Sequence, residues 1–469
     1  MKSEQRFLYF PPPLAGAGVG DGGQIVRLNF SGAFAAFLLF WVNGAMAQKV
    51  EAPRSVEAIA ASVSAIRIYW LPTAGATKYR IWREGQAVAE VPAPTTDYED
   101  TAIAVGSQHI YQVQAETAGG NSPLSPPYTE RAFAPFPMSE RRGKIPSASF
   151  DVVVTQASSG GVSAAIEAAR RGLSVALVEP TTRLGGMPVN GLSATDLRRD
   201  AFQSGFFVRF RQRVVALYAA EGLTKQDGRK YEPRIAHQAM KSLLYETPNL
   251  TIFRRARLSR VRTKADFADD SRRSVTSVTV DELSASGEPT GRKAELQAKV
   301  FIDATDCGDL AAMAGAKFRT GREPRSQREP HNGVIYYDRK TTKALPGSTG
   351  EGDKRIQAYS YLVTVKDYGP NADKTIPKPA NYTREEFLDP TLPNWKSTWA
   401  YDSGVMPYGK HELNQHPRGA DLQGTNYAYP TADYKTRARI EKQFYERAMR
   451  YLYFIQTEYG MRNMALPDD

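Results

Sequence analysis

Residues 149–186 read SFDVVVTQASSGGVSAAIEAARRGLSVALVEPTTRLGG, and this stretch decides the fold of the chain. Residues 150–155 form a short β-branched run, which is typical of a buried parallel strand. Four small residues follow at 158–161, where a helix begins and backbone N–H groups are able to approach a pyrophosphate. A second apolar run ends in Glu179, whose carboxylate is placed to accept hydrogen bonds from both ribose hydroxyls. Strand, loop, helix, strand and acid in this order predict a βαβ unit that holds an ADP-containing cofactor.

The loop of this unit departs from the glycine pattern G-x-G-x-x-G. Gln156, Ser158 and Gly161 stand at the three glycine positions, and only the third glycine, which lets the helix pack close to the strand, is intact. A positive φ at Gln156 would cost roughly 1–3 kcal/mol. Ser158 is small enough for close approach, and its hydroxyl is a candidate ligand for a phosphate oxygen. A parallel-sheet domain that binds no nucleotide is the alternative, but Glu179 and the residues after it favour nucleotide binding.

The length and charge of the chain limit its class. A chain of 469 residues is expected to form two or three domains. The formal net charge of +11 is spread along the sequence, and the densest basic cluster lies at 254–262, within a strand-like segment. A solvated sheet face explains this cluster better than nucleic-acid binding, for which the sequence has no motif. We therefore expect no nucleic-acid partner.

The N-terminal 47 residues have the pattern of a secretory signal. Arg27 precedes the apolar run AFAAFLLFWV at 33–42, and an A-x-A site at 45–47 predicts cleavage after Ala47. This run is too short to span a bilayer comfortably, so we expect no membrane span after cleavage and a secreted or periplasmic protein. An uncleaved anchor is the alternative. Because residues 1–26 do not fit a basic n-region, we expect translation to begin near Val26.

Cysteine and histidine usage argues against a metal centre. Cys307 is the single cysteine, which excludes a disulfide framework, a metal–thiolate site and an iron–sulfur cluster within one chain. The five histidines are scattered, and none stands four residues from another beside an acid, so no zinc site is expected. We expect Cys307 to fill a small space beside the cofactor loop, with a reactive thiol as the alternative.

Residues 52–132 show a sequence pattern different from that of the βαβ unit. Short alternating runs are separated by turn signals at regular spacing, the pattern of an all-β sandwich. With Pro53 at the entry, Trp70 in the second strand, Tyr79 in the third and GGNSPLS at 119–125, the segment resembles a fibronectin type III domain. This resemblance implies a spacer or a module that contacts surfaces or glycans, and the spacer is the interpretation that we favour.

The fibronectin resemblance has one departure, and a linker follows it. His109 falls on the usual position of the corner tyrosine, with Tyr111 two residues later. Residues 133–148 are rich in proline, serine and charge, as expected of a linker between domains.

The residues after Glu179 indicate the class of cofactor. The double glycine Gly185–Gly186 lets the chain pass close to a bulky ligand without side-chain interference. The blocks DVVV, SGGV, VEP, RLGGM and GLSATD, in this order, resemble the FAD-dependent oxidoreductases of the glutathione-reductase structural class. They are distantly similar to the flavin subunits of heterodisulfide reductases. The resemblance implies an FAD-binding domain at 149–330 and FAD as the cofactor.

Later blocks extend this resemblance. Residues 249–261 match the strand that such proteins run past the adenine, and residues 274–280 and 294–304 match the strands of a β-meander that returns to the nucleotide sheet. The run FIDATDCGDL at 301–310 is similar to the family signature D-A-T-x-x-G-D, although Asp309 could equally cap the helix that begins there. Together the blocks imply these cofactor-binding residues: Ser158, Ser159, Gly160, Gly161, Glu179, Arg183, Gly185, Gly186, Leu258, Ala304, Thr305, Gly308 and Asp309.

The remaining residues, 331–469, imply a substrate domain of α+β type. The resemblance continues weakly, includes a long helix at about 432–458, and stops at Asp469, whereas family members run on through a further segment that contacts the flavin. We therefore expect an incomplete substrate domain, from a fragment or an interrupted gene. The sequence identifies no catalytic residue. Five side chains are substrate-side candidates by position alone, and each also fits an ordinary loop or surface role: His331, His411, His416, Tyr401 and Asp433.

Three functions follow from the sequence. The first is an exported multidomain oxidoreductase in which a small organic or carbohydrate-like substrate passes a hydride to flavin. The second is an extracellular carbohydrate- or surface-binding protein with a degenerate, non-catalytic flavin-type fold. The third is an NAD-type dehydrogenase, which Gly185–Gly186 and the late D-A-T-x-x-G-D turn disfavour.

Overall fold

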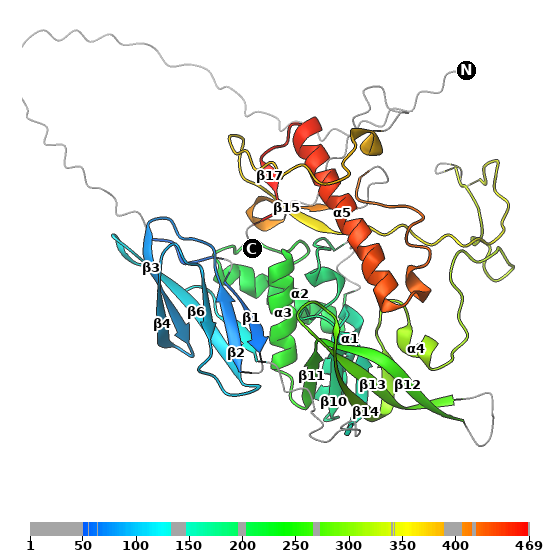
Figure 1. Ribbon diagram of the computed structural model, residues 1–469, viewed down its shortest axis with the longest axis horizontal. Helices are drawn as coiled ribbons and strands as arrows, with labels where there is room; N and C mark the ends of the chain where they lie inside the picture. Colours follow the sequence, from blue (N-terminus) through cyan, green and yellow to red (C-terminus); the bar gives the residue numbers. More distant parts are fainter. Residues whose placement is uncertain are drawn as a thin grey trace, which may run out of the picture. The chain divides into compact units, whose positions relative to one another are not determined.

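The computed structural model of the chain describes residues 50–54, 56–62, 64–132, 147–195, 203–265, 273–338, 341, 343–388, 406–414 and 419–467. The expected signal segment, most of the expected linker, Tyr401 and His416 lie outside these described residues. Within them the chain forms an all-β region, an α/β region and a smaller C-terminal region (Figure 1).

The all-β region is a sandwich of two antiparallel sheets. One sheet has the order β1-β2-β5, and the other has the order β4-β3-β6-β7 with β8 also paired to β6. This strand order is that of a fibronectin type III domain. The strands are β1 (Glu57–Ser62), β2 (Ala65–Tyr69), β3 (Ala76–Arg83), β4 (Gln86–Pro92), β5 (Asp97–Asp100), β6 (Gln108–Thr117), β7 (Gly120–Asn121) and β8 (Tyr128–Arg131).

Alternating apolar residues of the two sheets make the sandwich core. Trp70 and Tyr79 are both buried, with ring centroids 5.3 Å apart. The position expected to be unusual, His109, lies at the edge and contacts Glu84 and Ser107. Tyr111 is fully buried instead, and its hydroxyl donates to Asp100 Oδ2 at 2.9 Å. Tyr111 therefore ties the end of β5 to β6.

The α/β region is built on a six-stranded sheet of order β11-β10-β9-β14-β13-β12. Strands β9, β10, β11 and β14 run parallel, whereas β13 is antiparallel to both β12 and β14. The strands are β9 (Ser147–Thr155), β10 (Val175–Glu179), β11 (Leu250–Arg254), β12 (Ala256–Ala265), β13 (Arg273–Leu283) and β14 (Pro289–Asp303). This arrangement is the expected βαβ unit followed by a β-meander that returns beside β9.

Both faces of β9 are buried, which explains its continuous apolar run. Val152 and Val154 pack with three helices, while Val153 faces the cluster that includes the meander strands. The helices are α1 (Ser159–Arg170), α2 (Gly205–Ala220) and α3 (Pro233–Tyr245). The short helix α4 (Asp309–Met313) follows β14.

The single strand expected at 249–261 is wrong, because the structure has two. Arg255 adopts a positive φ of 50°, which breaks β11 from β12. The basic cluster at 254–262 is also not one solvated face. Arg254 is an almost fully buried side chain in an ion pair with Glu130, and Arg257 lies over the Tyr434 ring at 4.3 Å.

The C-terminal region combines a small sheet with one long helix. The sheet has the order β16-β15-β17, and the helix α5 packs against it through Tyr451, Leu452 and Ile455. The elements are β15 (Val363–Asp367), β16 (Lys410–Leu413), α5 (Tyr434–Glu458) and β17 (Met464–Ala465). The expected helix at about 432–458 is therefore present, and Asp433 caps its first turn by accepting from Thr436 N at 2.7 Å.

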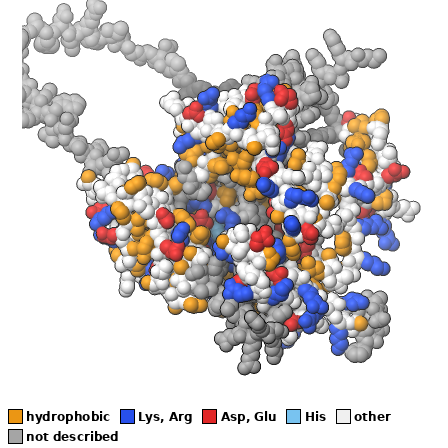
Figure 2. All heavy atoms as spheres, in the orientation of Figure 1, with side chains coloured by type: hydrophobic (Ala, Val, Ile, Leu, Met, Phe, Trp, Pro, Cys, Tyr) orange, Lys and Arg blue, Asp and Glu red, His pale blue; other side chains and the backbone are white. Residues whose placement is uncertain are grey.

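The sandwich packs against the α/β region. Its strands β1 and β8 meet α3 of the α/β region, and Lys241 of α3 forms a buried ion pair with Glu130 of β8 at 2.5 Å. Figure 2 shows basic and acidic side chains interspersed on the displayed face.

Candidate cofactor cavity

The turn between β9 and α1 is tight because of Gly161. A Cβ atom at position 161 would lie 2.1 Å from the Gln156 carbonyl oxygen and 2.9 Å from the Ala304 Cβ. No side chain fits there, which is the role expected of the third glycine. Gln156 has a φ of 72°, so the departure from glycine at that position carries backbone strain.

Position 158 does not require glycine, because the φ of Ser158 is −62°, which lies in the ordinary range. Its hydroxyl oxygen caps α1 by accepting from Gly161 N at 3.2 Å, which leaves the hydroxyl proton to donate outward. Ser159 donates from Oγ to the Gly185 carbonyl at 2.7 Å, and the position of Gly160 has room for a side chain. The serine at 158 therefore stabilises the loop.

Gln156 is held by a partner that the sequence did not indicate. Its Nε2 donates to Asp306 Oδ2 at 2.7 Å, and Asp306 N donates to Gln156 Oε1 at 3.2 Å. This pair joins the first loop to the D-A-T-x-x-G-D turn across 150 residues of sequence. The only hint of this contact in the sequence was Gln156 itself, a glutamine where the pattern has glycine.

Glu179 lies at the mouth of the loop. Its Oε2 accepts from Ala157 N at 3.0 Å, while Oε1 accepts from Thr181 N at 2.9 Å and from Thr181 Oγ1 at 2.6 Å. Burial raises the pKa of the Glu179 carboxyl, of which 4% is exposed. With Oε1 filled, this arrangement has room for one ribose hydroxyl on Oε2 rather than the two expected.

The double glycine Gly185–Gly186 packs closely against other parts of the chain. A side chain at Gly185 would meet Val189 and Met240 at 2.7 and 2.8 Å, and one at Gly186 would meet the Ser158 Cα at 3.0 Å. Both residues have positive φ values, of 137° and 68°. The expectation that these glycines clear space for the ligand needs correction, because they first clear space for α1 and α3.

The D-A-T-x-x-G-D turn is organised by Asp303 and Thr305. Asp303 Oδ2 accepts from Ala311 N at 2.9 Å, and Thr305 Oγ1 accepts from Asp309 N at 2.7 Å, so these two side chains satisfy the start of α4. Gly308 is the N-cap residue, with a φ of 72°. Capping by Asp309 is therefore wrong, since its carboxylate forms two bonds to Arg437 of α5, at 2.7 and 2.8 Å.

Leu258 is buried on β12, and its carbonyl accepts from the Tyr434 hydroxyl at 3.1 Å. Arg183 donates twice to the Val189 carbonyl, at 3.0 and 2.5 Å, and so holds the 3-10 turn Met187–Val189. Both side chains reach the same cavity.

These elements border a cavity of about 1490 Å³. Six predicted residues border it: Glu179, Arg183, Gly186, Leu258, Thr305 and Asp309. Ser159 and Gly160 border a smaller neighbouring cavity of about 380 Å³. The other predicted residues, which are Ser158, Gly161, Gly185, Ala304 and Gly308, shape the loops behind the wall. Within the described ranges, no group of three or more His, Cys, Asp or Glu side chains is arranged to hold a metal ion.

A model of the FAD dependent oxidoreductase family matches residues 151–468 of this chain. The chain belongs to that family. Its cofactor is accordingly FAD, and the protein is an FAD-dependent oxidoreductase. A search of curated proteins found no match.

Solved structures similar to the chain include three fibronectin-type domains. They are a Fn3-like protein from Clostridium thermocellum (23% identity, 20% of this chain, 100% of that chain, TM-score 0.17), the fn3 domain of the human collagen alpha-1(XX) chain (16%, 20%, 94%, 0.18) and FN3tt (16%, 18%, 96%, 0.17). The fibronectin type III assignment itself rests on the strand order described above.

The residues of this FAD-dependent oxidoreductase fit its cofactor. The cavity exceeds the roughly 300–1,000 Å³ typical of sites for drug-sized ligands, as an extended dinucleotide requires. Glu179 brings a buried carboxylate to its wall, and the start of α1 lies directly behind Gly186. Glu179 and the loop would hold the adenosine diphosphate moiety. In the part of the chain that is described, no helix has the length and apolar character to cross a membrane.

The three substrate-side candidates within the described residues do not converge on the cavity. His331 is exposed and lies 3.4 Å from the Tyr337 hydroxyl, and His411 is buried on β16, where burial lowers its pKa. Asp433 caps α5. Cys307 does border the cavity, half-buried, and burial raises the pKa of its thiol.

Sequence reasoning missed several polar residues on the cavity wall, among them Glu232, Arg234, Tyr361 and Lys410. Lys410 Nζ forms a buried ion pair with Glu232, which also accepts from Arg234 Nη2 at 2.9 Å. Lys410 stands in the block GKHELN at 409–414, where the pattern drew attention to the histidine instead.

Proposed function

We propose that this oxidoreductase is exported and takes a hydride from a small organic or carbohydrate-like substrate. The position of Glu179 is the observation that supports the flavin site most directly. Its carboxylate accepts a hydrogen bond from Ala157 N in the loop, and the same residue borders the large cavity. Export is supported by the signal-like pattern at 27–47 and by the fibronectin type III domain, a type common in exported proteins.

The polar wall supports a hydroxyl-bearing substrate. Glu232, Arg234 and Lys410 offer both donors and acceptors beside Tyr361, and their charges are already paired with one another. A substrate with neutral hydroxyl groups is able to bind such a wall without leaving a buried charge unpaired. A strongly charged substrate would have to break these ion pairs.

The cofactor and the protein divide the work. When bound, FAD supplies the two-electron redox chemistry. The protein binds and orients: the amides at the start of α1 and the carboxylate of Glu179 hold the adenosine diphosphate moiety, and the paired charges near Lys410 orient the substrate.

The variant Glu179→Ala tests this assignment. It removes a charge-assisted bond to the ribose, each such bond being worth roughly 1.5–3 kcal/mol, so FAD retention should weaken by about tenfold or more. The measurement is a titration of apoprotein with FAD, followed by flavin fluorescence. Glu246→Ala is the matched control, because Glu246 is exposed and pairs with Arg213 away from the cavity.

Glu179 also fastens Ala157 and Thr181, so the stability of the apoprotein must be measured beside the affinity. Wild-type affinity in Glu179→Ala would overturn the ribose assignment. A colourless wild-type protein that takes up no added FAD would favour the non-catalytic binding protein instead.

Export has its own test. The full precursor, expressed in a bacterial host, should yield a mature chain that begins at Gln48 in the secreted or periplasmic fraction. An intact N-terminus in the cytoplasmic fraction would contradict this part of the proposal.

A further inference from the structure

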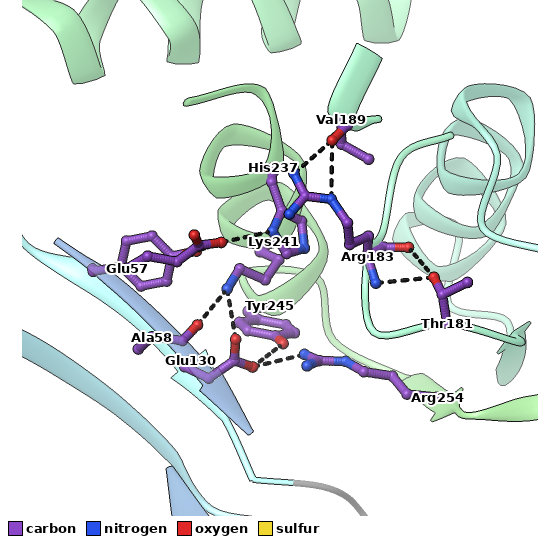
Figure 3. Close-up of polar contacts among 11 residues, drawn as sticks. Glu57, Ala58, Glu130, Thr181, Arg183, Val189, His237, Lys241, Tyr245 and Arg254 are labelled. Carbon is purple, nitrogen blue, oxygen red and sulfur yellow. Dashed lines mark hydrogen bonds and ion pairs between the residues drawn. The ribbon is translucent and has the colours of Figure 1, made fainter. Parts of the chain in front are cut away.

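The fibronectin type III domain joins the FAD domain through a buried carboxylate (Figure 3). Glu130 of β8 accepts from Lys241 Nζ at 2.5 Å, from the Tyr245 hydroxyl at 2.8 Å and from Arg254 Nη2 at 2.8 Å. The side chains of Glu130, Lys241 and Arg254 are 1%, 0% and 5% exposed. Separating the domains would strip this carboxylate of all three side-chain donors, so the contact is built into the fold.

The same face of α3 makes further contacts to the sandwich. Lys241 Nζ also donates to the Ala58 carbonyl at 3.2 Å and lies 4.2 Å from the centre of the Tyr128 ring. Gln238 Nε2 donates to the Pro127 carbonyl at 2.7 Å. Both β1 and β8 therefore have a fixed position against α3.

Glu57, the first residue of β1, extends this contact to the cavity. It borders the cavity together with Arg183 and Glu179, although it belongs to the sandwich. Its Oε1 lies 3.4 Å from His237 Nδ1 and 3.4 Å from the Tyr128 hydroxyl. Burial raises the pKa of the Glu57 carboxyl, but the His237 hydrogen bond and the charges of Lys241 and Arg183 outweigh it and lower the pKa to about 2. Glu57 is therefore ionised.

Arg183 connects this negative charge to the cavity wall. Its guanidinium acts electrostatically on both Glu57 and His237 and donates twice to the Val189 carbonyl. The turn Met187–Val189 that it holds also borders the cavity. A carboxylate of the sandwich and the cation that holds this turn of the FAD domain therefore border the same cavity, and both are labelled in Figure 3.

We propose that the fibronectin type III domain is a wall of the FAD cavity, and that Glu57 is a positioning residue that acts through Arg183 on the turn Met187–Val189. The domain then has a role in cofactor binding and in the electrostatics of the redox site. A negative charge on the wall of the cavity disfavours the uptake of electrons by FAD bound there, so Glu57 should lower the reduction potential of bound FAD.

The test compares Glu57→Gln with two other variants of the full chain. Glutamine keeps the size of the side chain and an acceptor for His237 Nδ1, and it removes the charge. We expect the FAD dissociation constant to rise about threefold to tenfold and the midpoint potential of bound FAD to rise. The potential is measured by reduction in the presence of an indicator dye, which requires no substrate.

Glu99→Gln is the matched control, because Glu99 lies on the same sandwich, is exposed and pairs with Arg67. Glu130→Gln separates stability from cavity effects. It should lower the unfolding temperature and leave the potential of the folded, FAD-bound protein unchanged, because Glu130 does not border the cavity.

Two results would overturn the proposal: wild-type affinity and potential in Glu57→Gln, or equal changes in Glu57→Gln and Glu99→Gln. Because these readouts need bound FAD alone, a wrong assignment of substrate or export leaves the test intact.

Discussion

The cavity has two ends that are built in different ways. At the loop end, backbone geometry around Gln156 and Gly161 and the nearby carboxylate of Glu179 come from one stretch of 24 residues. At the sandwich end, Glu57 meets His237 across 180 residues of sequence, and Glu130 meets Lys241 across 111. The comparison shows that a local motif marks the place of a cofactor, while contacts between residues distant in sequence hold a second domain beside it, of which Glu57 reaches the cavity.

The largest expected effect lies at the sandwich end. Lys241→Met removes one partner of a fully buried ion pair, which should lower the free energy of unfolding by about 4 kcal/mol. Lys78→Met is the control, because Lys78 is part-exposed on the sandwich and pairs with Glu90, so its loss should change the stability little.

Urea denaturation, followed by tryptophan fluorescence and by circular dichroism, measures both variants. Wild type should unfold in one transition by both probes, because the interface couples the two domains. Equal costs for Lys241→Met and Lys78→Met would remove the distinction between the buried interface and an exposed ion pair.

The next effect belongs to the loop end. Gly161→Ala places a methyl group 2.1 Å from a backbone oxygen, and the shift that relieves this contact should cost about 3 kcal/mol and abolish FAD retention. Gly160→Ala, one residue earlier, meets no atom closer than 3.9 Å and should be nearly neutral. Comparable losses in the two variants, measured by denaturation and FAD titration, would show that the close packing at position 161 does not govern the loop.

The sequence predicted the loop end well for a physical reason. The βαβ unit, the third glycine and Glu179 follow from local backbone geometry and from a short apolar period, so a single stretch of sequence contains them. The long helix α5 followed from the same kind of pattern, whereas the β-meander was implied by the family resemblance. The break at Arg255 was missed, because a positive φ at an arginine has no signal in the sequence.

The sandwich end was not predictable in the same way. Lys241 and Gln238 read as ordinary polar residues of an amphipathic helix, yet they are buried at 0% and 7% exposure because they face another domain. Lys410 and Glu232 form a buried pair across 178 residues. Such pairs depend on tertiary packing, and neither partner has a local motif.

The third prediction concerns the pH dependence of stability that arises from His237 at the sandwich end. Burial and the neighbouring Lys241 charge lower the pKa of His237 from 6.5 to about 3, so the unfolded chain binds the proton more readily than the folded one. Stability should therefore fall as the pH falls from 6.5 toward 3, by about 2 kcal/mol at pH 5.

His237→Gln should remove most of that slope, which urea titrations between pH 7 and pH 5 measure. Glu179 acts in the opposite direction, since its raised pKa costs stability as the pH rises past 4.5. A slope that stays the same in His237→Gln would mean that other groups govern the acid sensitivity.

The smallest effect separates strain from hydrogen bonding at Gln156. The residue has a φ of 72°, which favours glycine, but its side chain makes two bonds with Asp306. Gln156→Ala loses the bonds and keeps the strain, whereas Gln156→Gly loses both. We expect Gln156→Gly to be more stable than Gln156→Ala by about 1 kcal/mol, and Gln156→Gly to lie close to wild type because the two terms offset each other. If the glycine and alanine variants are equally stable, the positive φ at this position carries no cost, and the degenerate loop is as well adapted to its cofactor as one with three glycines.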